Sequence, residues 1–110
     1  SMSHRDDSAC LLDIAHAARA VALFIEGMDE AAFLGDMKTQ AAVQHQIMII
    51  GEASKRLTPS FREAHPDIPW NAIARMRDRL IHGYGTVDLG VVWRTASEAI
   101  PGLLRAVSDC

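Results

Sequence analysis

The chain has 110 residues, of which 49% are hydrophobic and 23% charged, so it suits one folded domain and excludes a disordered chain. Its net charge of −3 excludes a basic field over the whole surface, so an anionic partner would have to bind a local patch. That patch is expected in the second half, because the net charge is −4 in residues 1–50 and +1 in residues 51–110.

The first predicted helix spans residues 7–26, where apolar residues recur at helical spacing before Gly27, a stop signal. Leu12, Leu23 and Phe24 fall outside the apolar stripe. They are either scattered surface residues or part of a subunit interface.

Two aspartates predict the next helix starts, because a side-chain oxygen there accepts a hydrogen bond from an unpaired backbone N–H. Asp29 is expected to cap a short turn through Phe33, and Asp36 a long helix to about Leu57.

Within that long helix, Glu52 precedes Lys55 and Arg56 by three and four residues, which predicts ion pairs along the helix surface. In the connector that follows, Ser60 is the predicted cap of a turn through Ala64.

The last two predicted helices begin at Pro69 and Asp88. The first runs to about His82 and ends at Gly83. The second contains Pro101 on its polar side, which predicts a kink rather than a stop.

No segment alternates between apolar and polar residues over the length of a strand, so the predicted fold class is all-α. We expect an antiparallel helical bundle of four main helices plus one or two short helical turns. It forms a single domain over residues 7–108, with residues 1–6 interpreted as a tag scar and a frayed terminus.

The cysteines, Cys10 and Cys110, lie near opposite ends of the chain and form no CxxC or Cys/His pattern. Neither a structural zinc site nor a disulfide framework is expected, which fits a reducing, cytoplasmic location. No apolar run approaches the roughly 20 residues of a membrane span, so no membrane association is predicted.

The segment after Pro69 places a charge on its apolar face. The predicted buried stripe is Trp70, Ile73, Met76, Leu80 and Ile81. The opposite face carries Arg75, Asp78, Arg79 and His82. Arg77 falls within the buried stripe, where an unpaired guanidinium is costly. Arg77 therefore snorkels, pairs with a carboxylate from another helix, or is held at a cleft or interface to bind an anion.

In a regular helix, Arg77 and His82 point roughly 140° apart. They converge only if the helix loosens near Gly83 or if a second subunit brings its own copy. This geometry predicts a composite site formed by a dimer. Tyr84, the only tyrosine, follows directly.

The run from Arg77 to Tyr84 fits the pattern Arg-x4-His-x-Tyr and resembles the signature of HepT-type toxins in the HEPN family. The resemblance covers most of the chain from about Asp7. The flanking blocks that carry it are Ile50-Gly-Glu-Ala-Ser-Lys-Arg-Leu57, Pro66-Asp-Ile-Pro-Trp70, Val87-Asp-Leu-Gly-Val-Val-Trp93 and the ending Pro101-Gly-Leu-Leu104.

The resemblance implies a ribonuclease toxin of a type VII-like HepT/MNT toxin–antitoxin system that acts as a homodimer and needs no metal or other cofactor. Its expected partner is a minimal nucleotidyltransferase (MNT) antitoxin. By the same resemblance, Arg77 and His82 are catalytic, Asp78 supports the site, and Tyr84 is the tyrosine that the antitoxin adenylylates with ATP.

The chemistry suits these residues because RNA carries its own nucleophile, the 2′-hydroxyl. His82 would take the 2′-hydroxyl proton, and Arg77 would stabilise the negative charge on the phosphorane. Cleavage would leave a 2′,3′-cyclic phosphate and a 5′-hydroxyl. Arg75 and Arg79 would guide the RNA backbone electrostatically.

Two other interpretations stay open at this point. The bundle could be a non-catalytic partner of a nucleotidyltransferase, presenting a substrate to it. Alternatively, it could be a structural bundle in which Arg77 makes only a salt bridge.

Overall fold

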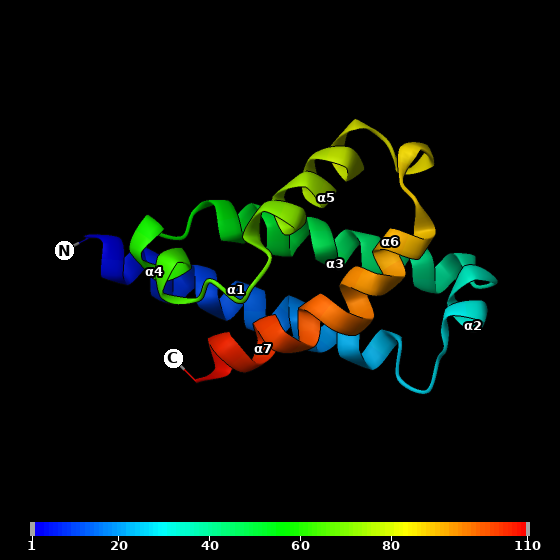
Figure 1. The fold of residues 1–110 in the computed structure, drawn as a ribbon, viewed down its shortest axis with the longest axis horizontal. Coiled ribbons are helices and arrows are strands. Elements are labelled where there is room, and N and C mark those ends of the chain that lie inside the picture. The colour runs from blue at the N-terminus through cyan, green and yellow to red at the C-terminus, as the bar shows by residue number, and fades with distance from the viewer. Residues whose placement is uncertain (1, 110) are drawn as a thin grey trace.

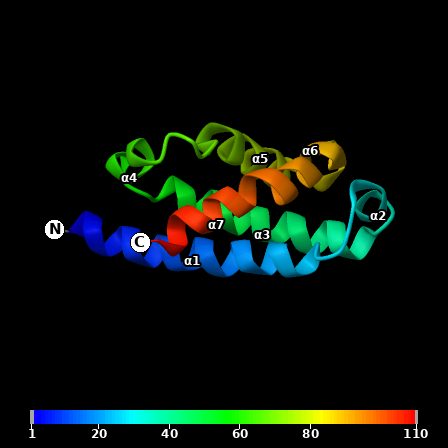
Figure 2. The same cartoon turned by 60° about the horizontal axis from the view of Figure 1, so that its bottom comes forward.

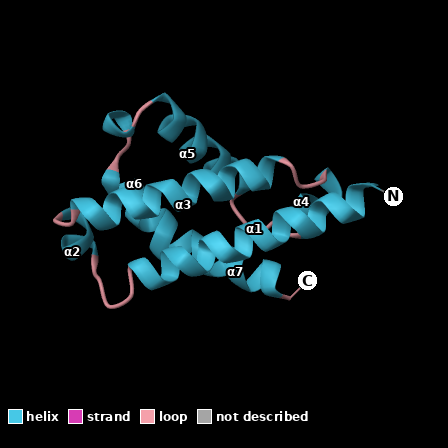
Figure 3. Cartoon of the chain, turned by 180° about the vertical axis from the view of Figure 1, so that it is seen from behind, coloured by secondary structure: helices cyan, strands magenta, loops and turns pink. Residues whose placement is uncertain are grey.

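The chain folds as helices joined by short loops, and the part that the structure describes contains no strand (Figure 3). This computed structural model describes the backbone of residues 2–109 and the side chains of residues 7–83 and 85–109. The elements are α1 (Met2–Phe24), α2 (Glu30–Leu34), α3 (Met37–Lys55), α4 (Pro59–Ala64), α5 (Trp70–His82), the 3-10 turn η1 (Tyr84–Thr86), α6 (Leu89–Arg94), the π-helical turn η2 (Thr95–Ala99) and α7 (Ile100–Ser108). The predicted all-α bundle is confirmed.

The long helices α1 and α3 lie side by side and run in opposite directions (Figure 1). Helix α5 packs on α3 and helix α7 packs on α1, both on the same side of this pair (Figure 2). The short helix α2 closes one end of the bundle against α3 and α6. Both termini lie at the other end (Figure 1).

The core lies between the layer of α1 and α3 and the layer of α5 and α7, and every long helix contributes large side chains to it. Fully buried are Ile14, Val21, Phe33, Val43, Ile47, Ile50, Ile73, Val92, Ile100 and Leu103. Phe33 comes from the short helix α2, and its ring lies 5.4 Å from the Trp93 ring of α6. Burial of these side chains is the main term that stabilises the bundle.

The predicted caps Asp29, Asp36 and Asp88 begin α2, α3 and α6, each accepting a hydrogen bond from a backbone N–H of the first turn. Asp36 accepts from the backbone N–H of Thr39 at 3.0 Å and from its hydroxyl at 2.7 Å. These two hydrogen bonds from Thr39 hold the pKa of Asp36 below its ordinary value, and the bond from the backbone N–H has the larger effect.

The predicted cap of the connector turn was wrong, because α4 begins after Thr58 rather than at Ser60. Asp7, on α1, accepts hydrogen bonds from the Thr58 backbone N–H at 2.9 Å and from its hydroxyl at 2.7 Å. The Thr58 hydroxyl oxygen in turn accepts from the Phe61 backbone N–H at 3.3 Å, which caps α4, and Asp7 ties this cap to α1.

Helix continues across Pro101, and the five residues before Ile100 form the π-helical turn η2. The Ile100 N–H donates to the Thr95 carbonyl, five residues back. The missing N–H of Pro101 and its ring disfavour the ordinary helical bond at this point, and a wider turn accommodates both. The hydroxyl of Ser97 donates to the Trp93 carbonyl at 2.7 Å within the same stretch.

Several large apolar side chains lie on the surface. Leu12, Leu23 and Phe24, predicted outside the core stripe, are 57%, 68% and 39% exposed. Among the described residues, no helix is long and apolar enough to cross a membrane.

Candidate active site

Helix α5 carries the candidate residues, and both of its ends are fixed. At its start, the Trp70 indole N–H donates to the carbonyls of Arg62 and His65 at 3.2 and 3.0 Å. At its end, Gly83 adopts a positive φ of 145°, which favours glycine. Between these points α5 is a regular α-helix that includes His82.

Arg77 lies directly against α3, where Gly51 leaves room for it. A Cβ on the buried Gly51 would come within 2.3 Å of the Arg77 Cβ and within 2.7 Å of its Cγ. The two helices therefore touch at this point only because residue 51 has no side chain. The Arg77 side chain keeps 20% of its surface exposed, so it sits at the edge of the helix contact.

The guanidinium of Arg77 is bound by two carboxylates. Its Nη2 contacts Glu52 Oε2 of α3, and its Nη1 donates to Asp78 Oδ1 at 3.0 Å. Lys55 lies 3.8 Å from the same Asp78 oxygen. Two positive and two negative groups thus form one cluster, which we call the Arg77 cluster (Glu52, Lys55, Arg77 and Asp78).

This pairing corrects the ion pairs predicted along α3. Glu52 pairs with Arg77 of the neighbouring helix rather than with Lys55 or Arg56. Arg56 instead lies 3.9 Å from Asp13 of α1. Glu52 therefore acts between α3 and α5 rather than along α3.

Arg77 and Asp78 stabilise each other's charged forms. The hydrogen bond from Arg77, together with the nearby positive charges of Lys55 and Arg77, holds the pKa of Asp78 below its ordinary value, although partial desolvation opposes this. The hydrogen bond to Asp78 is also the largest cause that raises the pKa of Arg77. Arg77 is therefore a permanent cation with a fixed orientation.

The Nε atom of Arg77 is buried and has no hydrogen-bond partner among the described residues. Guanidinium carries five N–H donors, and the two contacts with Glu52 and Asp78 use one on each Nη. The guanidinium therefore has more N–H donors than these two contacts use.

His82 is exposed and is the last residue of α5. Because α5 stays regular to His82, its side chain and that of Arg77 leave the helix roughly 140° apart. Of the two ways in which they could converge, loosening of the helix does not occur within α5. The last turn also corrects one predicted core position, because Ile81 is 49% exposed.

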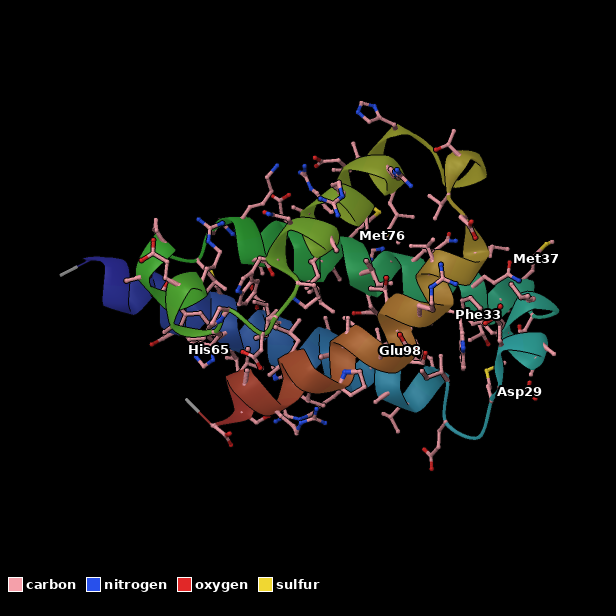
Figure 4. The ribbon with its side chains drawn as sticks, viewed as in Figure 1. Asp29, Phe33, Met37, His65, Met76 and Glu98 are labelled. Carbon is pink, nitrogen blue, oxygen red and sulfur yellow. The ribbon has the colours of Figure 1, made fainter. Side chains whose placement is uncertain are left out.

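Arg75 and Arg79 line a different surface from the Arg77 cluster. With Ala72, Met76, Val91 and Thr95 they enclose a groove of about 230 Å³ between α5 and α6. Met76 lies on the side of α5 that faces this groove (Figure 4). Two positions along a helix turn its face by about 200°, so both arginines point roughly 160° away from Arg77.

The remaining candidate, Tyr84, has its side chain outside the described part of the structure. Its backbone begins the turn η1 directly after α5. Among the described residues, no group of three His, Cys, Asp or Glu side chains is arranged to hold a metal ion.

Comparison with known proteins finds both a family model and close relatives. The model described as ribonuclease HepT-like matches residues 14–109. A Thermococcus cleftensis protein named “Probable ribonuclease HepT” is 48% identical over 101 residues, which cover 92% of this chain and 89% of that protein. “Putative RNase MJ0127” of Methanocaldococcus jannaschii is 33% identical over 108 residues, covering 98% of this chain and 89% of that protein. No solved structure matches.

The contact at Gly51 predicts an unequal response of two helical glycines to alanine. Gly51→Ala should cost about 1–3 kcal/mol, because its new methyl group overlaps the Arg77 side chain and α5 must shift. Gly102→Ala is the matched control, since the nearest heavy atom to its Cβ, Arg105 Nη2, is 3.7 Å away. It should stabilise the helix by up to about 1 kcal/mol. Urea unfolding of both variants measures the difference, and equal stabilities would contradict the close contact.

Proposed function

The chain belongs to the HepT-like ribonuclease family, and from that premise we propose that it is a metal-independent endoribonuclease and the toxin of a HepT/MNT pair. The observation that carries the proposal is the arrangement on α5, where Arg77 is a fixed cation and His82 an exposed imidazole. Arg77 can stabilise a phosphorane, and His82 can transfer a proton. Which RNA is the substrate is left open by this proposal.

In the proposed reaction, the 2′-oxygen of a ribose attacks the adjacent phosphorus. His82 accepts the 2′-hydroxyl proton as the new P–O2′ bond forms, because an imidazole exchanges protons near neutral pH. The P–O5′ bond breaks and the 5′-oxygen leaves, gaining a proton from solvent. The products are a 2′,3′-cyclic phosphate and a 5′-hydroxyl.

Arg77 stabilises the charge that accumulates on the phosphorus oxygens. A planar guanidinium already oriented by Glu52 and Asp78 needs little reorganisation to donate its remaining Nη protons. Asp78 therefore supports the site by holding Arg77, and its lowered pKa extends this ion pair to lower pH.

We expect a homodimer in which Arg77 of one subunit acts with His82 of the other. Support comes from the direction of the two side chains, which diverge on one α5 and so need a second copy to share a phosphate. Exposed apolar side chains such as Ile81, beside the candidate site, offer surface for this contact.

A specific observation favours a second candidate, a bundle without catalytic activity. The Glu52–Arg77 contact is the cross-helix ion pair that a structural role for Arg77 requires. The same contact is compatible with both functions, so activity has to distinguish them. The proposed MNT partner fits either one.

Removal of either proposed catalytic group should abolish cleavage. Total RNA incubated in EDTA with wild-type protein should give discrete fragments with cyclic-phosphate ends, whereas His82→Ala and Arg77→Ala should each lose at least about a hundredfold in rate. Each variant must first be shown to be folded, and mass spectrometry must show Tyr84 without an adenylyl group. If Arg77→Met cleaves RNA at the wild-type rate and is as stable as the wild type or more stable, Arg77 has no catalytic role and its only function is the salt bridge.

Mixing the two inactive variants tests whether the site is shared. A heterodimer of Arg77→Ala and His82→Ala retains one intact site if each site takes its arginine and histidine from different subunits. After subunit exchange at equal concentrations, activity should return to about a quarter of the wild-type value, because half of the dimers carry one of two sites. No recovery, with exchange verified by differently tagged subunits, would place both residues of each site in one subunit.

Adenylylation of Tyr84 is the proposed means by which the partner silences the enzyme. An added AMP would place bulk and negative charge directly after α5 and oppose entry of RNA. Treatment with the MNT partner and ATP should inactivate the wild-type protein and leave Tyr84→Phe active. The mass of the treated protein and its cleavage rate check this, and loss of activity in Tyr84→Phe would point to inhibition by binding alone.

A further inference from the structure

The Arg77 cluster on its own is a weak attractor for RNA. Glu52 and Asp78 balance the charges of Lys55 and Arg77, so the cluster has no net charge. A polyanion gains most of its affinity from neutralising phosphates with unpaired cations. The cations that supply this affinity have to lie elsewhere on the surface.

Three such cations follow one path across α4 and α5. The groove between the α4–α5 connector and α5 has a volume of about 650 Å³ and is lined by Arg62, Trp70 and Arg75, among others. We call it the connector groove. Arg75 also lines the groove between α5 and α6, together with Arg79. The two grooves therefore meet at Arg75.

These arginines have no ion pair with any described carboxylate, in contrast to Arg77. Glu63 is the one acidic side chain among the described residues that line the two grooves. The path from Arg62 through Arg75 to Arg79 is therefore positive on a molecule whose net charge is −3.

Trp70 gives the connector groove a rigid aromatic wall. Its indole N–H is held by the carbonyls of Arg62 and His65, and its ring meets the Phe61 ring edge-on at 6.3 Å. His65 lies on this connector, at the far end of the molecule from Asp29 and Phe33 (Figure 4). A fixed aromatic surface flanked by cations is the combination that binds unpaired nucleotides.

We propose that the connector groove binds a single-stranded segment of the RNA substrate, with its phosphates on Arg62 and Arg75 and one base against Trp70. The inference rests on the proposed function and adds to it the place where the substrate is held. Single-stranded RNA is the favoured ligand because its unstacked bases can reach an aromatic wall, whereas those of a duplex cannot.

The path also leads to the proposed general base. Arg75, Arg79 and His82 share one face of α5, since they are four and three residues apart. Arg75 and His82 are separated by about 10 Å along the helix axis. An RNA strand held in the connector groove thus follows α5 towards His82 of the same subunit.

The first experiment measures binding without cleavage. Fluorescence anisotropy of a labelled single-stranded oligoribonucleotide is recorded with His82→Ala protein over a range of salt concentrations. Adding Arg62→Gln, or independently Arg75→Gln, should weaken binding and reduce the slope of log affinity against log salt by about 0.7 for each phosphate that the variant no longer neutralises. Glu63→Gln should strengthen binding, because it removes the groove's negative charge.

Arg19→Gln is the matched control, since Arg19 is an exposed arginine of α1 that lines neither groove. It should leave the salt slope unchanged. If Arg62→Gln and Arg75→Gln, both folded, behave like Arg19→Gln, the connector groove does not bind RNA phosphates and the proposal is wrong.

A second measurement addresses the base. Trp93→Phe leaves Trp70 as the only tryptophan, so its emission reports on the connector groove. The oligoribonucleotide should quench this emission with the midpoint seen by anisotropy, whereas inorganic polyphosphate, which has no bases, should not. Equal quenching by polyphosphate, or none by RNA, would exclude stacking on Trp70.

The binding experiments and the cleavage assay can fail independently of each other, so the two proposals are tested separately. If wild-type protein cleaves RNA and needs both catalytic residues, but the groove variants bind RNA normally, the proposed ribonuclease activity is supported and the proposed RNA-binding groove is wrong. If the groove variants lose RNA binding but neither the wild type nor any variant cleaves RNA, the RNA-binding groove is supported and the proposed ribonuclease activity is wrong.

Discussion

The approach of α5 to α3 at Gly51 is the contact on which the arrangement of the site depends. With no Cβ at residue 51, the Arg77 Cβ occupies the space that a side chain would fill. This contact fixes the rotation of α5, so that Ile73 and Leu80 enter the core and His82 stays in solvent. One glycine therefore determines both the packing of α5 and the direction in which its charged residues point.

The same contact explains how an arginine can lie within an apolar stripe. Covering the Arg77 Nε against α3 costs desolvation energy, and the contacts with Glu52 and Asp78 offset it. The result is a cation whose orientation is fixed before any ligand arrives, at the expense of its attraction for anions. Such a group suits the stabilisation of charge that appears during a reaction better than the capture of a substrate.

Sequence reasoning succeeded where local chemistry decides the structure and failed where a distant segment does. The caps at Asp29, Asp36 and Asp88 follow from hydrogen bonds within one turn, and the position of Arg77 among apolar residues follows from helical periodicity.

The partner of Glu52, in contrast, depends on which helix lies beside α3. The start of α4 is an exception, because its signal is local: Thr58 caps the helix and Pro59 is its first residue. Ile81 is exposed whereas Leu80 of the same turn is buried, because Ile81 lies about 80° around the helix from Ile73, at the edge of the apolar stripe. Helical periodicity alone predicts that α5 has two faces. What each face contacts depends on the neighbouring helices. One face holds Arg77 among charges that cancel, and the other carries His82 in line with Arg75 and Arg79, which have no partner among the described carboxylates. In the proposed ribonuclease, substrate affinity and charge stabilisation would belong to opposite sides of a single helix, and a site that used both sides on one phosphate would need two copies of that helix.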